Sequence, residues 1–326
     1  MTSKEVVSRT IRFEGAERLP YDLPPEFGSD IVMRNMEPSP DDRLSKGIDE
    51  WGAVWDNVGD SLFGEVTTFP LKEWEDWDSL KIPDYKDPAR WEVLKNARQE
   101  AGDKFLLGIG ISLYERIHFL RGLENTWMDI LAAPDKLEPL LDLLVEMNLY
   151  AVEKYAELGF DGYIWADDWG LQDQLMIPGD AWRSLWKERY RTVFDAVHKA
   201  GMLTFIHSCG EITEILGDFI EVGLDVIQMD QQENMGLERL GEEFGGKITF
   251  WSPVDIQKTM VKGSLEDIRT YCQRMVKSLG RSNGGFIPKY YYDIKGAGHR
   301  DEAVKVMSEE FLKLSEEHGE KYYIKK

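Results

Sequence analysis

From about residue 100 onward, the chain alternates six times between a short apolar run and a longer amphipathic segment. The apolar runs have the length of β-strands, and the segments between them repeat their apolar residues at helical spacing. Because strands joined by crossover helices pair in parallel, the pattern predicts a parallel sheet covered by helices. The expected strands span residues 104–112, 160–167, 203–209, 224–229, 247–251 and 285–291, and the expected helices span residues 134–158, 178–200, 212–222, 235–244, 264–279 and 300–317.

Several of the expected strands end in polar or aromatic residues, which favours a closed barrel with a site at its C-terminal rim. The alternative is an open doubly wound sheet, but no Gly-x-Gly-x-x-Gly motif follows a first strand. We therefore predict an α/β fold, a (β/α)8 TIM-like barrel with an N-terminal capping extension. Residues 1–326 are expected to form a single domain, with about 1–80 as the cap and about 100–326 as the barrel.

The composition excludes several classes of partner. With 39 Lys and Arg against 60 Asp and Glu, the formal net charge is −21, which opposes binding to nucleic acid and to anionic membranes. No apolar run is long enough to span a membrane, and the first residues do not resemble a signal peptide. Because the chain has only two cysteines, we expect a cytoplasmic protein. The oligomeric state stays open, with a homodimer as one alternative.

The strand expected over 203–209 ends in the motif His207-Ser208-Cys209-Gly210. Side chains two positions apart on a strand point to the same face, so His207 and Cys209 are expected to project together where the strand meets a loop. An imidazole nitrogen and a thiolate sulfur would supply half of a zinc site. Two alternatives remain: a buried cysteine beside a hydrogen-bonded core histidine, and a cysteine nucleophile that the histidine activates.

Two carboxylates, Asp167 and Asp168, end the strand expected over 160–167, and at a barrel rim they are candidate catalytic residues. Adjacent strand residues face opposite sides, so a regular strand directs only one of the two into the barrel. The alternative is that one of them caps the next helix or lies in solvent. The sequence alone does not decide which carboxylate faces the site.

Other polar and aromatic residues follow the ends of the expected strands and would surround the same rim. Four of them either line the rim or cap a helix through an ion pair, namely Glu115, Arg116, His118 and Arg121. The expected substrate-binding residues are Trp169, Gln172, Gln228, Gln231, Asp255 and Tyr291.

The order and spacing of several short motifs resemble the uroporphyrinogen decarboxylase-like superfamily from roughly residue 40 to the C-terminus. The motifs are Asp49-Glu50-Trp51-Gly52, Asp167-Asp168-Trp169-Gly170, His207-x-Cys209-Gly210, Gly223-Leu224-Asp225 and Gly284-Gly285-Phe286-Ile287. The arginine-rich N-terminal motif of the true decarboxylases is not found. The His-x-Cys pair instead resembles the zinc- and corrinoid-dependent methyltransferases of the same superfamily.

The resemblance to those methyltransferases implies that His207 and Cys209 are zinc ligands and that a second cysteine lies near the last strand. No cysteine occurs near residues 290–292, and Cys272 falls inside an expected helix. Three alternatives follow: a carboxylate such as Asp168 completes the metal site, another neighbouring residue does, or the metal has been lost. Loss of one thiolate leaves a harder zinc, which suits an ether or alcohol oxygen better than a thiol.

The function implied by the resemblance is that of an O-demethylase type of methyltransferase. It would move a methyl group from a methoxylated, aromatic or otherwise methylated small molecule to the corrinoid (cobalamin) of a partner corrinoid protein, with Zn²⁺ activating the leaving heteroatom. Asp167 or Asp168 would complete the metal site or orient the substrate, and Trp169 and the tyrosines would stack on an aromatic ring. The alternatives are a decarboxylase of the uroporphyrinogen decarboxylase type, a methylcobamide:thiol methyltransferase and a binding protein without metal.

Overall fold

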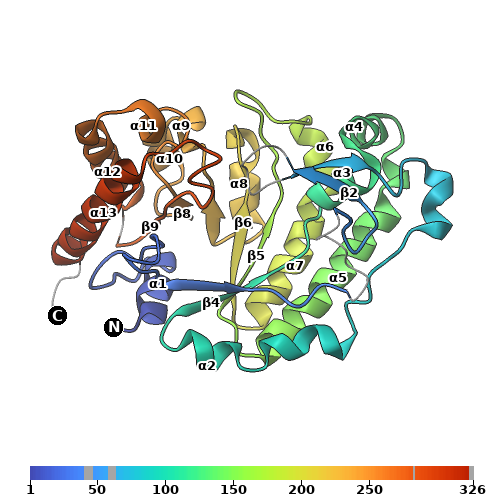
Figure 1. Cartoon of the computed structure of the whole chain (residues 1–326), viewed down its shortest axis with the longest axis horizontal. Coiled ribbons are helices and arrows are strands. Elements are labelled where there is room, and N and C mark those ends of the chain that lie inside the picture. Colours follow the sequence, from blue (N-terminus) through green and yellow to red (C-terminus); the bar gives the residue numbers. More distant parts are fainter. Residues whose placement is uncertain (40–46, 58–63, 282, 323–326) are drawn as a thin grey trace.

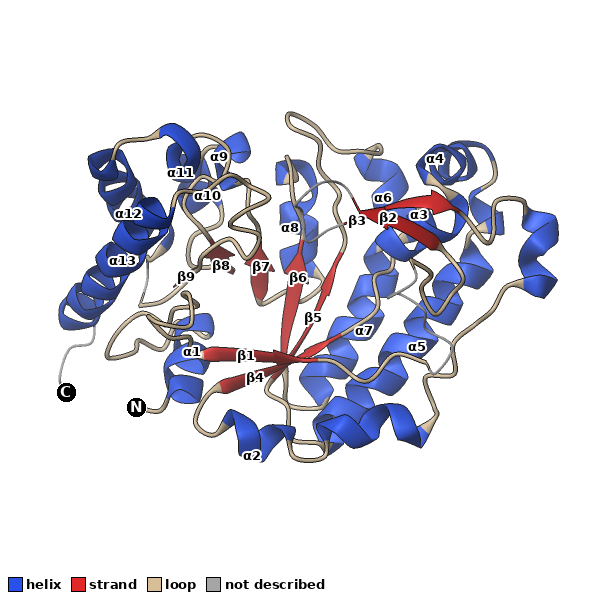
Figure 2. Cartoon of the chain, viewed as in Figure 1, coloured by secondary structure: helices blue, strands red, loops and turns tan. Residues whose placement is uncertain are grey.

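The computed structural model describes residues 1–39, 47–57, 64–281 and 283–322, and a curled sheet of seven parallel strands forms its centre (Figures 1 and 2). The strands pair in the order β1-β4-β5-β6-β7-β8-β9. This arrangement confirms the predicted α/β fold of the TIM-barrel type. The bounds of the strands are Ile31–Arg34 (β1), Phe105–Ile109 (β4), Gly162–Ala166 (β5), Leu203–His207 (β6), Val226–Gln228 (β7), Thr249–Ser252 (β8) and Phe286–Pro288 (β9).

Both faces of this sheet are buried, which explains why the strands read as continuous apolar runs. One face encloses an interior cluster to which the strands contribute alternate residues, such as Phe105 and Leu107 of β4 or Leu203 and Phe205 of β6. The other face packs against the surrounding helices in a second, larger cluster. The strands therefore have a fixed register, and their carboxyl ends meet at one rim of the barrel.

Helices surround the sheet on its outer face (Figure 1). In this view, α5 and α7 lie on one flank, and α12 and α13 lie on the opposite flank beside both ends of the chain. The bounds of these outer helices are Glu138–Glu157 (α5), Lys187–Lys199 (α7), Thr213–Glu221 (α8), Leu237–Glu243 (α10), Leu265–Leu279 (α12) and Asp301–Tyr322 (α13). None of the described helices combines the length and the apolar character needed to cross a bilayer.

Two of the expected helices are divided in the structure. The helix expected over 178–200 forms α6 (Gly179–Leu185) and α7, which meet at the fully buried Trp186. The helix expected over 235–244 forms α9 (Gln232–Met235) and α10, because Gly236 adopts a φ of +82° that a helix interior does not accept. Periodicity alone did not detect either break, since the apolar face continues across it.

The N-terminal region contributes to both ends of the barrel. Helix α1 (Ser3–Ile11) begins with a capping box at Thr2 and places Val7 and Ile11 in the interior cluster, at the end where the strands begin. The hairpin of β2 (Val54–Asn57) and β3 (Gly64–Thr68) lies near α3 (Glu115–Arg121) in Figure 2. This hairpin adjoins the opposite end of the barrel, where the site is found.

Asp22 connects the two edges of the sheet. No strand ladder joins β9 to β1 within the part of the chain that the structure describes. Instead, the Asp22 amide donates to Pro288 O at 2.9 Å, and the Tyr290 amide donates to Asp22 O at 3.0 Å. The Asp22 carboxylate also accepts a hydrogen bond from the Tyr292 hydroxyl at 2.5 Å. The segment before β1 thereby links the last strand to the first.

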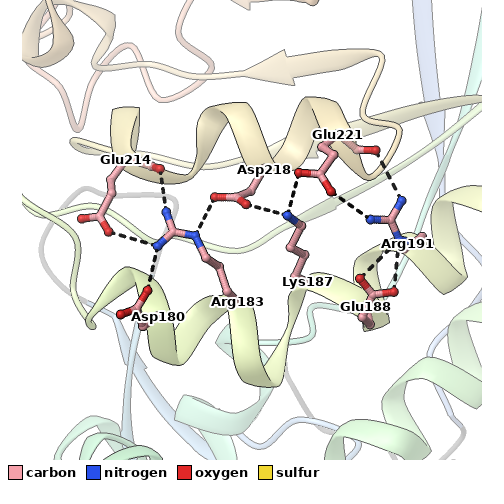
Figure 3. Close-up of polar contacts among 8 residues, drawn as sticks. All are labelled: Asp180, Arg183, Lys187, Glu188, Arg191, Glu214, Asp218 and Glu221. Carbon is pink, nitrogen blue, oxygen red and sulfur yellow. Dashed lines mark hydrogen bonds and ion pairs between the residues drawn. The ribbon is translucent and has the colours of Figure 1, made fainter.

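A ladder of ion pairs joins α6 and α7 to α8 (Figure 3). At its centre, Asp218 accepts from Arg183 Nε at 2.9 Å and from Lys187 Nζ at 2.7 Å. Lys187 also reaches Glu221 at 2.8 Å. Because α8 begins at Thr213, soon after the motif that ends β6, the ladder helps to fix the loop that carries this motif.

Candidate metal centre

Two neighbouring strands end at the candidate site. The parallel pairing of β5 with β6 places Ala166 opposite His207. Asp168 and Cys209 each follow two residues later, just past the ends of β5 and β6, so the same register brings them near each other. The pairing continues past the strand ends, because the Asp167 amide donates to His207 O at 2.9 Å. A one-residue slip would separate these side chains, and the buried faces of both strands prevent it.

The loops after β5 and β6 approach each other at two glycines. The Gly170 amide donates to Cys209 O at 3.2 Å, and the Cys209 amide donates to Asp168 Oδ1 at 2.8 Å. Gly210 has a φ of +77°, and a Cβ atom there would lie 2.2 Å from Gly170 O. The glycines therefore permit a contact between backbones that larger residues would block.

Asp168, His207 and Cys209 form a cluster whose potential ligand atoms all lie within 4.8 Å of one another. His207 Nε2 lies 3.3 Å from Asp168 Oδ1 and 3.4 Å from Cys209 Sγ. All three side chains are partly exposed, so a ligand can reach them. A nitrogen, a sulfur and a carboxylate oxygen are donors that zinc prefers, and three protein ligands leave a position for substrate.

The three side chains of this cluster shift one another's pKa values. Burial opposes ionisation of Asp168, but the hydrogen bond from His207 lowers the pKa of this carboxyl below its ordinary value. Burial alone would lower the pKa of His207, but the neighbouring Cys209 and Asp168 raise it well above its ordinary value. Burial raises the pKa of the Cys209 thiol. A metal ion bound here would replace protons of the histidine and the thiol.

Asp167 points away from this cluster and is fully buried. Its carboxylate accepts hydrogen bonds from five donors: the backbone amides of Leu113, Tyr114 and Glu115, the Trp165 indole and the Tyr190 hydroxyl. Burial raises the pKa of Asp167 to about 6, against the effect of these donors. The carboxylate therefore anchors the chain that leads into α3.

Glu115 and His118, at the start of α3, lie beside the cluster. Burial, together with the nearby Asp168 and Asp167, raises the pKa of Glu115 to about 8. Burial lowers the pKa of His118 to about 3, and its Nδ1 lies 3.7 Å from Glu115 Oε1. This face of the site therefore carries two titratable groups whose neutral forms are favoured, the buried His118 and the partly exposed Glu115.

A model of the family described as uroporphyrinogen decarboxylase (URO-D) matches residues 64–290, which is more than half of the chain. The chain belongs to this family. The resemblance that the sequence motifs indicated is thus confirmed, although the matched region, 64–290, is shorter than the expected span from roughly residue 40 to the C-terminus. No sequence among the curated proteins matches the chain.

Solved structures with the same fold extend the comparison. A methyltransferase from Methanosarcina mazei superimposes with a TM-score of 0.70 and 16% identity, over 96% of this chain and 99% of that chain. An L-ribulose 3-epimerase follows at a TM-score of 0.45 and 13% identity, over 72% of this chain and 83% of the epimerase. The first likeness shows that this URO-D family member shares its whole fold with the methyltransferase, and the second is too remote to bear on function.

Three of the expected substrate-binding residues lie outside the cluster. Trp169 is fully buried, stacks on Tyr114 with ring centroids 3.8 Å apart, and donates its indole N–H to Tyr190. Gln172 is exposed and accepts from Asn234. The carboxylate of Asp255 accepts from the Thr259 amide and hydroxyl, and so caps the start of α11 (Thr259–Lys262).

Gln228, Gln231 and Tyr291 lie closer to the cluster. Gln228 Oε1 makes a short contact with His207 Nδ1, and Gln231 Oε1 accepts from the Gly210 amide at 2.9 Å. Burial raises the pKa of Tyr291 to about 12, with smaller contributions from acidic neighbours that include Cys209. Tyr291 also lines an open hollow of about 380 Å³ together with Ile256, Gln257, Val261, Asp293, Gly296 and Ala297.

The two arginines that were expected at the rim form ion pairs with aspartates of other parts of the chain. Arg116 pairs with Asp49 at 2.8 Å and Arg121 pairs with Asp129 at 2.6 Å, so both attach the N-terminal region and α4 (Leu123–Ala132) to α3. Sequence reasoning missed Lys289, which is 2% exposed and follows β9 directly. A lysine at the end of an apolar strand was the available signal, because buried lysines need a partner.

Proposed function

We propose that this member of the URO-D family is a zinc-dependent methyltransferase that transfers a methyl group from a small methylated molecule to the reduced cobalt of a corrinoid protein. The observation that supports this proposal is the cluster of Asp168, His207 and Cys209 at the rim of the barrel. In place of the absent second cysteine, Asp168 supplies an oxygen. The whole-chain similarity to a protein named as a methyltransferase agrees with the proposal.

The three side chains would hold zinc, which, when bound, withdraws charge from the heteroatom that carries the methyl group. The corrinoid of the partner protein would supply the electron pair that forms the new bond to the methyl carbon, while the bond from that carbon to the heteroatom would break. The heteroatom keeps its bonding pair and takes up a proton from water. The chain itself must hold the methyl carbon in line with the cobalt, which is a positioning task. Tyr291 lines an open hollow, and Gln231 holds the Gly210 amide of the loop that carries Cys209, so both are candidates for this task.

The donor class that fits is a methoxylated compound, because a site with one thiolate and one carboxylate is harder than a site with two thiolates. Decarboxylation of a polyanionic acid is the weaker alternative. It requires free cations at the rim, whereas Arg116, Arg121 and Lys289 each pair with an aspartate.

The first experiment is a measurement of the zinc content of the purified wild type beside Cys209→Ala. We expect about one zinc per chain in the wild type and a loss of zinc in the variant. Cys272→Ala is the matched control, because the Cys272 thiol is buried in α12, outside the cluster, and its loss should leave zinc in place. Zinc-free wild type, or zinc retained in Cys209→Ala, would contradict the proposed metal site.

The second experiment tests the reaction. Wild type is mixed with free reduced cobalamin and a panel of methoxylated aromatic compounds and methylamines, and methylation is followed by the absorbance of the corrinoid. We expect methylation with at least one methoxylated donor and none with Cys209→Ala. If a zinc-loaded wild type methylates cobalamin from no donor, the methyltransferase proposal fails. Release of carbon dioxide from an acid would then favour the decarboxylase.

A further inference from the structure

A buried chain of hydrogen bonds extends from His207 into the barrel. His207 Nδ1 contacts Gln228 Oε1, and Gln228 Nε2 donates to Asp230 Oδ1 at 2.8 Å. Lys289 Nζ donates to the same Asp230 oxygen at 2.9 Å. Gln228, Asp230 and Lys289 are at most 7% exposed, whereas the His207 side chain is 21% exposed. This series of hydrogen bonds thus begins at the buried ammonium group of Lys289 and ends at His207 of the candidate metal site.

The charged groups at the Lys289 end determine which atom donates and which atom accepts in every hydrogen bond of this series. An ammonium group can only donate, and an ionised carboxylate can only accept. Asp230 must therefore accept from the amide nitrogen of Gln228, which turns the amide oxygen toward His207. A flipped amide would place its oxygen against the Asp230 carboxylate, and burial makes that repulsion costly.

We infer that Lys289 and Asp230 act through Gln228 as positioning residues that hold the proton of His207 on Nδ1. The amide oxygen of Gln228 needs a donor, so the neutral His207 ring carries its hydrogen on Nδ1 and keeps its lone pair on Nε2. Nε2 is the atom that faces Asp168 and Cys209. This inference rests on the proposed function for its purpose, because the lone pair is what a zinc ion would bind.

The alternative tautomer is available in principle, since Asp168 Oδ1 lies 3.3 Å from Nε2 and could accept a hydrogen from it. It would turn the lone pair of Nδ1 toward the lone pairs of the Gln228 oxygen. Two facing lone pairs at hydrogen-bonding separation repel each other, and the Gln228 oxygen would be left without a donor from His207. The hydrogen bonds from Lys289 through Gln228 therefore favour hydrogen on Nδ1 of His207, whereas Asp168 favours hydrogen on Nε2.

The test uses ring nitrogen NMR of full-length, histidine-labelled, metal-free protein at the alkaline end of its stable range, where the ring is neutral. His207→Gln assigns the signal. Gln228→Leu removes the acceptor, and Asp230→Asn removes the group that sets the amide direction. Gln232→Leu is the matched control, because Gln232 is equally buried but donates to Pro253 O and the Tyr271 hydroxyl instead.

Wild type and Gln232→Leu should show hydrogen on Nδ1, and Gln228→Leu and Asp230→Asn should shift toward hydrogen on Nε2. In competition with a chromophoric chelator, the zinc affinity of these two variants should fall by about 10- to 100-fold, and that of the control should not. Hydrogen on Nε2 in the wild type, or a Gln228→Leu protein that keeps the wild-type tautomer, would overturn the inference. If the wild type binds no zinc, the proposed function fails, while the NMR result still decides this inference.

Discussion

Asp167 and Asp168 are adjacent carboxylates with different roles because their surroundings differ. Asp167 lies in the core with five donors, and Asp168 faces His207 and Cys209. Burial raises the pKa of Asp167, whereas at Asp168 the hydrogen bond and the charge of His207, with the Cys209 amide, outweigh burial and lower the pKa. The role of each of these two aspartates thus depends on the direction in which the chain turns after β5, and not on the residue type.

Replacing each aspartate by asparagine separates the two roles. Asp167→Asn places an amide N–H among five donors, so the free energy of unfolding should fall by about 2–3 kcal/mol. Asp168→Asn should change it by no more than about 0.5 kcal/mol and should weaken zinc binding by more than about tenfold. Urea unfolding and chelator competition check both results. Equal loss of stability in the two variants would contradict this division.

The site could be predicted from the sequence in part. The spacing of His207 and Cys209 was predicted from the period of a strand over 203–209. β6 ends at His207, but pairing continues to the Ser208 amide, which donates to Gln228 O, and Cys209 still lies beside His207. The roles of Asp167 and Trp169 could not be predicted, because they depend on a turn whose direction is set by tertiary contacts with Tyr190 and Ser208. Lys289 was missed because its partner, Asp230, lies on a different strand end.

Among the secondary-structure elements, the fit of α6 and α7 against α8 depends on charge as well as on apolar packing. Lys187 and Asp218 are the least exposed members of the ladder in Figure 3, with 16% and 14% of their side chains exposed. Strand and helix periodicity predicted the helices themselves, but the pairing across helices is invisible in a single sequence. A half-buried network is worth more than the exposed pairs around it.

We expect Asp218→Asn to lower the free energy of unfolding by about 1 kcal/mol at pH 7. Although partial burial opposes it, the hydrogen bonds from Lys187 and Arg183 hold the pKa of Asp218 below its ordinary value of 3.8. Because this pKa is lowered in the folded state, the stabilisation is complete above pH 3.8 and is lost as the pH falls through the lower folded value. Urea unfolding at several pH values should therefore show a difference between the two proteins that shrinks in acid.

Glu188→Gln provides the control for this element. Glu188 is 73% exposed and pairs with Arg191 within the same helix. Its replacement should change the free energy of unfolding by less than about 0.5 kcal/mol at any pH. A loss as large as that of Asp218→Asn would mean that exposure does not rank the pairs of this ladder.

At the scale of the whole molecule, the barrel depends on the N-terminal segment at two places. Asp22 bridges β9 to the segment that leads into β1, and α1 covers the interior cluster where the strands begin. The alternating pattern after residue 100 predicted six of the seven strands, but β1 is only four residues long and lies in a polar stretch. The alternation that revealed the other strands, some of them equally short, does not extend to β1, which pairs with β4 in the sheet.

If α1 is part of one cooperative unit with the barrel, a cavity made in it must weaken the whole molecule. Ile11 is 4% exposed within the interior cluster, so Ile11→Ala should lower the free energy of global unfolding by about 2–4 kcal/mol. Tryptophan fluorescence and circular dichroism should still report a single, coincident urea transition. Val93→Ala is the control, because Val93 is 51% exposed and should give a change within about 0.5 kcal/mol. An unchanged midpoint in Ile11→Ala would mean that α1 detaches before the barrel unfolds, so that the interior cluster is closed by the strands alone.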